Sequence, residues 1–578
     1  LKNINFEKTR YIDDNAFAGC AKLNSVTIPY SISEIGAGVF WGCDNLSRIT
    51  VDEKNERYHS DENNLAIIET ETNTLVSGCN KTVIPDGIKC IGKGAFSGMR
   101  KLTSIVIPNS VTSIKDGAFS HCSALTSFEI PGGVTTIEDN VFNGCTKLES
   151  IKLHNNITSI GEYAFASCNG LTTFDIPENV EHIGAKAFKN CEGLTSVNLP
   201  DKLKSIEDEV FYFCKNLEAI DIPDMVTNIG DSAFWACSKL AEIKIPNNVI
   251  SIGREAFRWC TELTSIEIPQ NVTNIGKSAF MQCTKLSSIK VDQENMAYDS
   301  REDCNAIIES KTGTLIAGCG TTFVPDGVTK IGEYAFYGQL SLTSLELPNS
   351  VTHIETSAFH YTGLSSITLP KSLKVIGVNA FNNCEFTSIE LPSSIDSIGQ
   401  CAFQSCSELI SVVLPKNIGK IPEGMFDSCR ALKTIVIPEG VETIESRAFW
   451  SCRRLETIEF PSTLQTIGRA SFWGCEGVKQ ITSHAITPPT VERGAFELID
   501  RLNCKLIVPE ESVEAYMGAN EWLWFYTADG IEGLEDESIV DVYNLQGVTV
   551  KRQVRMSDLQ GTLPKGIYII NGKKIAVR

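Results

Sequence analysis

A repeat of 23 residues runs through most of this 578-residue chain. A phenylalanine, usually preceded by alanine, returns at a spacing of 23 with two spacings of 22, one of 24 and two of 56. Such a period indicates a solenoid, in which each unit buries its apolar face against the next. The length therefore reflects one multiplied unit and not several separate domains. The column holds Phe17, Phe40, Phe96, Phe119, Phe142, Phe165, Phe188, Phe211, Phe234, Phe257, Phe280, Phe336, Phe359, Phe381, Phe403, Phe426, Phe449, Phe472 and Phe496.

Residues 263–285, LTSIEIPQNVTNIGKSAFMQCTK, show the content of one unit. Isoleucines on either side of Glu267 predict a half-buried strand, and Pro269 ends it because proline has no N–H to donate. A second short extended piece follows. Ala279, Phe280 and Cys283 then have helical spacing, which predicts a short helical turn that points all three inward.

The two spacings of 56 contain the same insertion. Residues 51–85 align with residues 291–325 at a constant offset of 240, with 17 of 35 positions identical. Residues 306–308 (Ala-Ile-Ile) and 314–316 (Thr-Leu-Ile) resemble two strands around a Lys-Thr-Gly turn, which predicts a hairpin projecting from the solenoid. The insertion is either a binding element or a modified coil that breaks the period.

The unit L-x-x-I-x-I-P-x-x-V-x-x-I-x-x-x-A-F-x-x-C, found at 263–283 and 455–475, resembles the BspA-like, or Treponema pallidum type, leucine-rich repeats. The resemblance covers about residues 1–485. It implies an α/β leucine-rich-repeat solenoid with a parallel β ladder on one side and short helical or irregular turns on the other. The family also implies a bacterial cell-surface protein of the Bacteroidetes kind that recognises proteins of a host or a neighbouring cell.

The C-terminal part departs from the repeat. Residues 486–527 resemble the unit that closes many such arrays, and a solenoid needs a cap because its last coil otherwise exposes apolar surface. Residues 528–538 are acidic and predict a linker. Residues 539–578 resemble a sorting domain of type IX secretion, and the Asn571-Gly572 pair independently indicates a hairpin in a small β-domain.

Fifteen of the 21 cysteines stand three residues after the repeat phenylalanine. No Cys-x-x-Cys pair occurs, which excludes the usual zinc-ribbon and thioredoxin motifs. Met99, Gln339 and Thr362 replace cysteine in the same column, so we expect small, reduced, buried residues, although neighbouring coils would bring the sulfurs near disulfide range. The seven histidines are scattered against the period. We expect no metal site, no cofactor and no catalytic residue.

Charge and hydropathy restrict the partners. The net charge of -20 makes nucleic acid a poor partner because the phosphate backbone attracts basic proteins. No apolar run approaches the roughly 20 residues of a membrane span. We expect a monomeric protein, secreted or on the outer surface, with any export signal removed, that binds an extracellular protein or glycoprotein.

Two surfaces are candidates for binding. Aromatic residues directly after the repeat phenylalanine, or one step further, predict a contact ridge; the alternative is packing between coils. The residue between the strand isoleucines carries mixed charges from Glu129 to Glu390, which predicts a solvated face or a site for an extended polar ligand. The candidate contact residues are Trp41, Tyr212, Trp235, Trp259, Trp450 and Trp473.

These patterns favour a surface scaffold for protein binding or adhesion, without catalysis. Two alternatives stay open from the sequence alone. One is a carbohydrate-active enzyme that uses paired carboxylates on the concave face. The other is a structural spacer on the cell surface.

Overall fold

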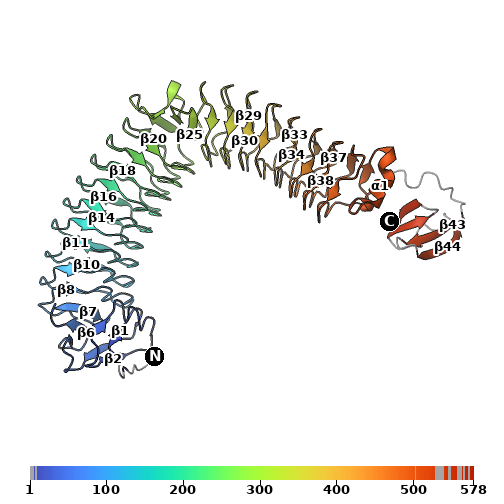
Figure 1. The fold of residues 1–578 in the computed structure, drawn as a ribbon. Coiled ribbons are helices and arrows are strands. Elements are labelled where there is room, and N and C mark those ends of the chain that lie inside the picture. Colours follow the sequence, from blue (N-terminus) through green and yellow to red (C-terminus); the bar gives the residue numbers. More distant parts are fainter. Residues whose placement is uncertain are drawn as a thin grey trace. The chain divides into compact units, whose positions relative to one another are not determined.

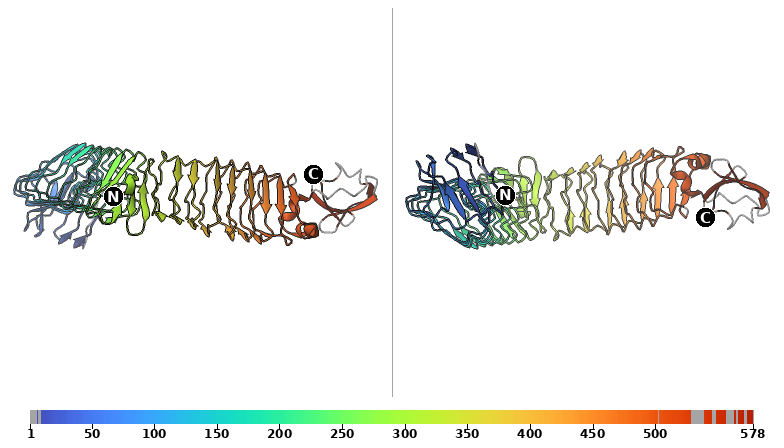
Figure 2. Two further views of the ribbon diagram at one scale, coloured as in Figure 1. Left: turned by 90° about the horizontal axis from the view of Figure 1, so that it is seen from above. Right: turned by 90° about the horizontal axis from the view of Figure 1, so that it is seen from below.

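The computed structural model describes residues 6, 9–501, 503–527, 539–544, 548–555, 563, 566–570 and 573–577 (Figure 1). The chain divides into two compact units, residues 1–311 with 317–321 and residues 312–316 with 322–578. In each unit the coils follow one another side by side in sequence order (Figure 1), and Figure 2 shows this again for the second unit. Both units are parallel β solenoids, as the repeat predicts.

Most coils contribute to two parallel ladders, and the first ladder is divided into short sheets. The first ladder contains the strand that ends before proline, and the second contains the isoleucine that precedes the turn. Partners in neighbouring coils are 23 residues apart, as in Phe128↔Ile151 and Ile137↔Ile160. The repeat length therefore sets the register of both ladders.

In the first unit, the first ladder is formed by β2 (Ser25–Ile28), β4 (Arg48–Val51), β10 (Ser127–Glu129), β12 (Ser150–Lys152), β14 (Thr173–Asp175), β16 (Ser196–Asn198), β20 (Ser265–Ile268) and β22 (Ser288–Val291). Its second ladder is formed by β1 (Tyr11–Ile12), β3 (Glu34–Ile35), β8 (Cys90–Ile91), β9 (Ser113–Ile114), β11 (Thr136–Ile137), β13 (Ser159–Ile160), β15 (His182–Ile183), β17 (Ser205–Ile206), β18 (Asn228–Ile229), β19 (Ser251–Ile252) and β21 (Asn274–Ile275).

In the second unit, the first ladder is formed by β27 (Ser344–Glu346), β29 (Ser366–Thr368), β31 (Ser388–Glu390), β33 (Ser411–Val413), β35 (Thr434–Val436), β37 (Thr457–Phe460), β39 (Gln480–Ser483), β41 (Lys505–Ile507) and β42 (Tyr526–Thr527). Its second ladder is formed by β26 (Lys330–Ile331), β28 (His353–Ile354), β30 (Val375–Ile376), β32 (Ser397–Ile398), β34 (Lys420–Ile421), β36 (Thr443–Ile444), β38 (Thr466–Ile467) and β40 (Thr490–Val491).

The turn around the repeat phenylalanine is irregular, and the short helix expected there does not form. Residues two before and two after each phenylalanine have positive φ, as in Ser278 at 59° and Gln282 at 63° around Phe280. Alternate N–H groups of the turn donate to the next coil: Phe257 N bonds Ala279 O at 2.8 Å and Trp259 N bonds Met281 O at 3.0 Å. Because these groups bond between coils, they cannot bond within a helix.

The core consists of stacked identical residues. Phe257 lies between Phe234 and Phe280, with ring centroids 5.3 and 5.6 Å apart and rings within 3° of parallel. In the cysteine column, fourteen Sγ–H groups donate to the phenylalanine carbonyl of the preceding coil at 3.1–3.2 Å. All 21 cysteines are present as thiols and not as disulfides. The column is thus a hydrogen-bonded stack of small buried thiols.

Each insertion contains the strands of the expected hairpin. The first has β5 (Tyr58–Ser60), β6 (Ala66–Glu69) and β7 (Thr74–Gly78), in which β6 pairs antiparallel with both neighbours. β7 also pairs in parallel with β8, so this hairpin extends the second ladder and does not simply project. The second has β23 (Tyr298–Asp299), the 3-10 turn η1 (Arg301–Asp303), β24 (Ala306–Glu309) and β25 (Thr314–Gly318) at corresponding residues.

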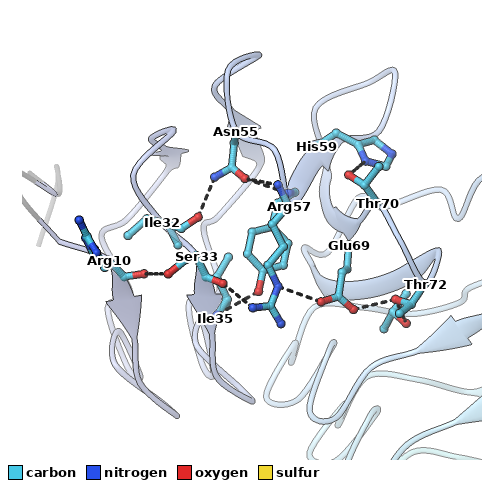
Figure 3. Close-up of polar contacts among 12 residues, drawn as sticks. Arg10, Ile32, Ser33, Ile35, Asn55, Arg57, His59, Glu69, Thr70 and Thr72 are labelled. Atoms are coloured by element: carbon cyan, nitrogen blue, oxygen red, sulfur yellow. Dashed lines mark hydrogen bonds and ion pairs between the residues drawn. The ribbon is translucent and has the colours of Figure 1, made fainter.

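A buried asparagine and a tyrosine attach each insertion to the coil before it, and Figure 3 shows Asn55 of the first insertion reaching Ile32. In the first insertion, Asn55 Nδ2 donates to Pro29 O at 3.0 Å and to Ile32 O at 2.9 Å, and Tyr58 Oη accepts from Ile35 N at 3.2 Å. The second insertion repeats these bonds with Asn295 and Tyr298, 240 residues later. The conserved geometry makes the insertion a modified coil of the solenoid.

After the last repeat phenylalanine, described helical segments appear at η2 (Glu510–Ser512), α1 (Val513–Gly518) and η3 (Trp522–Trp524). Tyr516 and Trp522 are both 1% exposed, and Trp522 packs against Phe496 with ring centroids 5.3 Å apart. Tyr516 Oη donates to Ala485 O at 2.9 Å, and Trp522 Nε1 donates to Pro489 O at 2.9 Å. These side chains bury the apolar surface of the last repeat.

The C-terminal residues form a small antiparallel sheet in the order β44-β43-β45-β46. Val540, Val542, Leu563, Tyr568 and Ile570 form its buried cluster. The predicted linker 528–538 and the Asn571-Gly572 pair lie outside the described residues. The strands are β43 (Ile539–Asn544), β44 (Thr549–Arg555), β45 (Gly566–Ile570) and β46 (Lys573–Val577).

Candidate binding surfaces

The aromatic column of the first unit forms a stack with a cation at one end. Tyr212 and Trp235 are nearly parallel, with ring centroids 4.5 Å apart and an interplanar angle of 4°. Lys189 Nζ lies 4.4 Å from the centroid of Tyr212 and also pairs with Glu209. A ring that lies between a cation and a second ring has both of its faces covered. Both aromatics are half-buried, and Lys189 and Trp235 cover the faces of Tyr212, so a partner reaches that ring at its edge.

Trp450 and Trp473 make the corresponding pair in the second unit. Their ring centroids are 5.0 Å apart and the rings are within 6° of parallel. Arg447 lies 5.0 Å above Trp450, and its guanidinium pairs with the buried Asp427 at 2.8 Å. Both indoles are half-buried. Stacking fixes the two rings, which lowers the entropy lost when a partner packs against their edges.

Trp41 and Trp259 occupy different surroundings. Trp41 is covered by Arg100, 5.3 Å from its ring, and its edge meets His121 at 6.2 Å. Trp259 has a φ of 64° and is 40% exposed, the most exposed of the six candidates. Among the described residues no ring contact joins it to Trp235. The structure therefore brings together Tyr212 with Trp235 and Trp450 with Trp473, and leaves the other two separate.

The face of the first ladder is polar over its middle coils. Lys152 Nζ pairs with Glu129 at 2.6 Å, and Asn198 donates a hydrogen bond to Asp175. Other coils carry exposed apolar residues at the same position of the repeat. These residues were not among the predicted contact residues, although their place in the repeat identifies them. They are Val83, Val106, Phe323, Val413, Val436 and Ile507.

Two shallow grooves of about 470 Å³ lie between coils of the first unit. One separates β12 from β14. The other is lined by Asp116, Glu138, Asp139, Glu162 and His182 beside the second ladder. Its carboxylates already have partners: Glu138 pairs with Lys115 at 2.7 Å, and Asp139 accepts from Glu162 N at 2.7 Å. These contacts join neighbouring coils.

The titratable groups with shifted pKa values belong mainly to the core. Burial raises the pKa of the Cys122 thiol well above its ordinary value of 9.0 and that of Cys145 to about 12. Burial also lowers the pKa of His360 from 6.5, and this ring lies 4.8 Å from Tyr337. Within the described part of the chain, no group of three His, Cys, Asp or Glu residues is arranged to hold a metal. A high pKa keeps the buried thiols protonated, as S–H donors.

The repeat, the two ladders and the cysteine stack agree with the comparison to known families. The BspA type leucine-rich repeat region matches in six copies, over residues 1–74, 67–195, 181–305, 329–456 and 419–514. The chain belongs to this family. Proteins of this type are repeat scaffolds, and the description of the family agrees with the coils seen in both units.

Solved structures of similar proteins come from several bacteria. A leucine-rich repeat protein of Bacteroides ovatus is 25% identical, covering 78% of this chain and 98% of its own, with a TM-score of 0.38. A leucine-rich cell surface protein of Faecalibacterium prausnitzii is 24% identical over 82% of this chain and 83% of its own, with a TM-score of 0.24. The T. pallidum leucine-rich repeat protein is 30% identical over 33% of this chain and 90% of its own, with a TM-score of 0.28.

No curated protein matches the sequence. Among the described residues, no helix has the length and apolar character required to cross a membrane.

Proposed function

We propose that the chain is a secreted or cell-surface scaffold that binds extracellular proteins or glycoproteins through the outside of its solenoid. The observation that carries this proposal is the pair Trp450 and Trp473, which is fixed by stacking and by Arg447 yet half-exposed at the surface. Rigid, partly exposed aromatics beside arginine are the side chains that contribute most to protein interfaces. Family membership supports the same role.

The role proposed is binding without catalysis. Carboxylates in the acidic groove are engaged with Lys115 or with backbone N–H groups of the next coil, so they serve the contact between coils. A glycosidase needs one carboxyl group free to donate a proton and another to act as base or nucleophile. The uneven distribution of stacked aromatics and exposed aliphatics also favours a recognition surface over a uniform spacer.

The proposal also includes a division of the chain into domains. We propose one solenoid over 1–485 with modified coils at 51–85 and 291–325, a cap over 486–527, a linker over 528–538 and a sorting domain over 539–578. The buried Tyr516 and Trp522 support the cap. The antiparallel sheet of β43 to β46 supports a separate C-terminal domain. A fusion of residues 539–578 to a passive carrier protein, expressed in a bacterium with type IX secretion, tests the sorting role by surface display of the carrier.

The binding role is tested by capture from extracts of extracellular matrix, mucin and bacterial surfaces. The intact chain should retain defined proteins, and Trp450→Ala/Trp473→Ala should weaken their retention about tenfold, because truncation of an interface tryptophan typically costs more than 1 kcal/mol. Trp41→Ala serves as the comparison variant because Trp41 lies outside the stacked pair of Trp450 and Trp473. Point variants are preferable to deletion of an insertion, which would remove buried Asn55 or Asn295. Absence of retained protein, or equal weakening in the control, contradicts the proposal.

A further inference from the structure

Two neighbouring coils of the second unit, residues 407–436, expose aliphatic side chains at positions where the coils on either side have polar ones. Ile410 is 44% exposed, Val413 58% and Val436 60%. Val413 is in register with Glu390 on one side, and Val436 is in register with Glu459 on the other. The two valines therefore replace charged residues in the middle of a polar column on the first ladder.

Exposed cations without an ion-pair partner in the described part of the chain border these aliphatic residues, together with the exposed Glu408 and Glu456. Arg430, Lys433, Arg453 and Arg454 are all exposed, and none forms an ion pair with a described residue. At the same positions of the first unit, Lys215 pairs with Glu192 at 3.1 Å and Lys285 pairs with Glu262 at 2.6 Å, whereas the exposed Lys22, Lys147 and Lys239 form no ion pair with a described residue. Unpaired cations at this edge are available to the carboxylates of a partner.

The stacked tryptophans border the same edge. Arg453 follows Trp450 by three residues, which limits the separation of their Cα atoms to about 11 Å. From Trp450 through Arg453 to Val436, the surface of two neighbouring coils thus changes from indole to guanidinium to aliphatic side chain. Such a succession complements a chain that presents carboxylates and apolar side chains in alternation.

We propose that this surface, formed by Ile410, Val413, Arg430, Lys433, Val436, Arg453 and Arg454, binds an extended acidic peptide segment with aliphatic side chains on a partner protein. The inference rests on the proposed binding function and names the chemistry of its partner. Carboxylates of the segment pair with the arginines, and its aliphatic side chains cover the two valines. Charge complementarity gives selectivity and speeds association, while the apolar contact slows dissociation.

The test uses the full chain and a fluorescent peptide of about ten residues that alternates glutamate with valine or leucine, a length able to span several strands. Fluorescence polarisation measures its affinity for the intact chain and for two charge-reversal variants. In Arg430→Glu/Arg453→Glu/Arg454→Glu the affinity should fall at least about tenfold. The matched control is Lys22→Glu/Lys147→Glu/Lys239→Glu, which reverses three exposed charges at equivalent columns of the first unit and should change the affinity less than about twofold.

The aliphatic contribution is tested separately. Val413→Thr/Val436→Thr should weaken binding several-fold, whereas Val83→Thr/Val106→Thr, in the same column of the first unit, should leave it unchanged. Peptides with lysine in place of glutamate, or serine in place of the aliphatic residues, should bind at least about tenfold more weakly. Circular dichroism should show that all four variants remain folded.

Three results overturn the inference: no binding of the acidic peptide, equal loss in both charge-reversal variants, or binding of the serine peptide or a heparin oligosaccharide as tightly as the acidic-aliphatic peptide. If the chain still captures proteins from extracts while any of these results holds, the binding function stands and only this surface assignment is wrong. If neither the peptide nor any extract protein is retained, both fail.

Discussion

Replacement of one repeat phenylalanine tests the physical basis of the solenoid. Phe257 is fully buried and stacks on both sides, so Phe257→Ala removes a ring from the middle of the column. A buried Phe→Ala change costs about 3 to 5 kcal/mol because of lost transfer energy and the residual cavity. The neighbouring rings are held by backbone bonds between coils and cannot close the gap, so a cost of about 5 kcal/mol is expected.

Phe323→Ala is the matched control. Phe323 is 44% exposed and stands in the strand-face column, outside the phenylalanine stack. Its removal should cost about 1 kcal/mol or less, since the ring is already largely hydrated. Both variants keep the charge and the length of the chain unchanged.

The assay combines urea unfolding with hydrogen exchange, because a repeat protein can lose structure locally. Phe257→Ala should increase exchange in coils 234–280 and leave distant coils of the same unit protected. Equal and small effects of Phe257→Ala and Phe323→Ala on unfolding and exchange would refute the claim that stacked phenylalanines carry the stability of the coils.

Three further predictions concern the cysteines, the insertions and pH. In the native chain a thiol reagent should react readily only at the half-buried Cys20, Cys90 and Cys401, and all 21 thiols should react after denaturation; a smaller total would reveal disulfides. Asn295→Ala should lower the free energy of unfolding in urea by about 3 kcal/mol, because it leaves the buried carbonyls of Pro269 and Val272 without their hydrogen-bond donor. Replacement of the exposed Asn247 by alanine should be neutral, and equal effects of the two substitutions would contradict this. Burial raises the pKa of Asp299, but hydrogen bonds from Arg301 and Ser310 outweigh burial and hold the pKa below 3.8. The ionised Asp299 therefore stabilises the fold above pH 3.8, and this stabilisation is lost as the pH falls through the lower pKa of the folded state. Asp299→Asn should remove that part of the acid sensitivity measured by thermal unfolding, and an unchanged acid profile would count against it.

The sequence predicts the ladders well because the spacing of phenylalanine, cysteine and proline sets both register and burial. Its failure at the turn has a physical cause. Ala279, Phe280 and Cys283 have helical spacing, but Ser278 and Gln282 adopt positive φ and the N–H groups between them bond to other coils. These hydrogen bonds join different coils, so the sequence of a single repeat unit does not predict them.

The candidate sites were predicted less completely. The column after phenylalanine predicted one edge of Tyr212, Trp235 and Trp259 and a second edge of Trp450 and Trp473. Ring contacts join Tyr212 to Trp235 and Trp450 to Trp473, and none among the described residues joins Trp259. The column did not predict that Lys189 and Arg447 would cover Tyr212 and Trp450. The unpaired state of the exposed cations around Arg453 could not be predicted from the sequence, because whether a charged side chain forms an ion pair depends on which residues of the neighbouring coils lie beside it. The insertion hairpin was visible in the sequence, while its pairing with β8 was not.

The most direct test of the account is a hydrogen-exchange footprint of the chain bound to a protein that it captures. The account predicts protection at the exposed residues around Trp450 and Trp473 and along β33 and β35, with no change in the already protected core. No protection anywhere in the solenoid, or protection confined to the C-terminal strands β43 to β46, would contradict it.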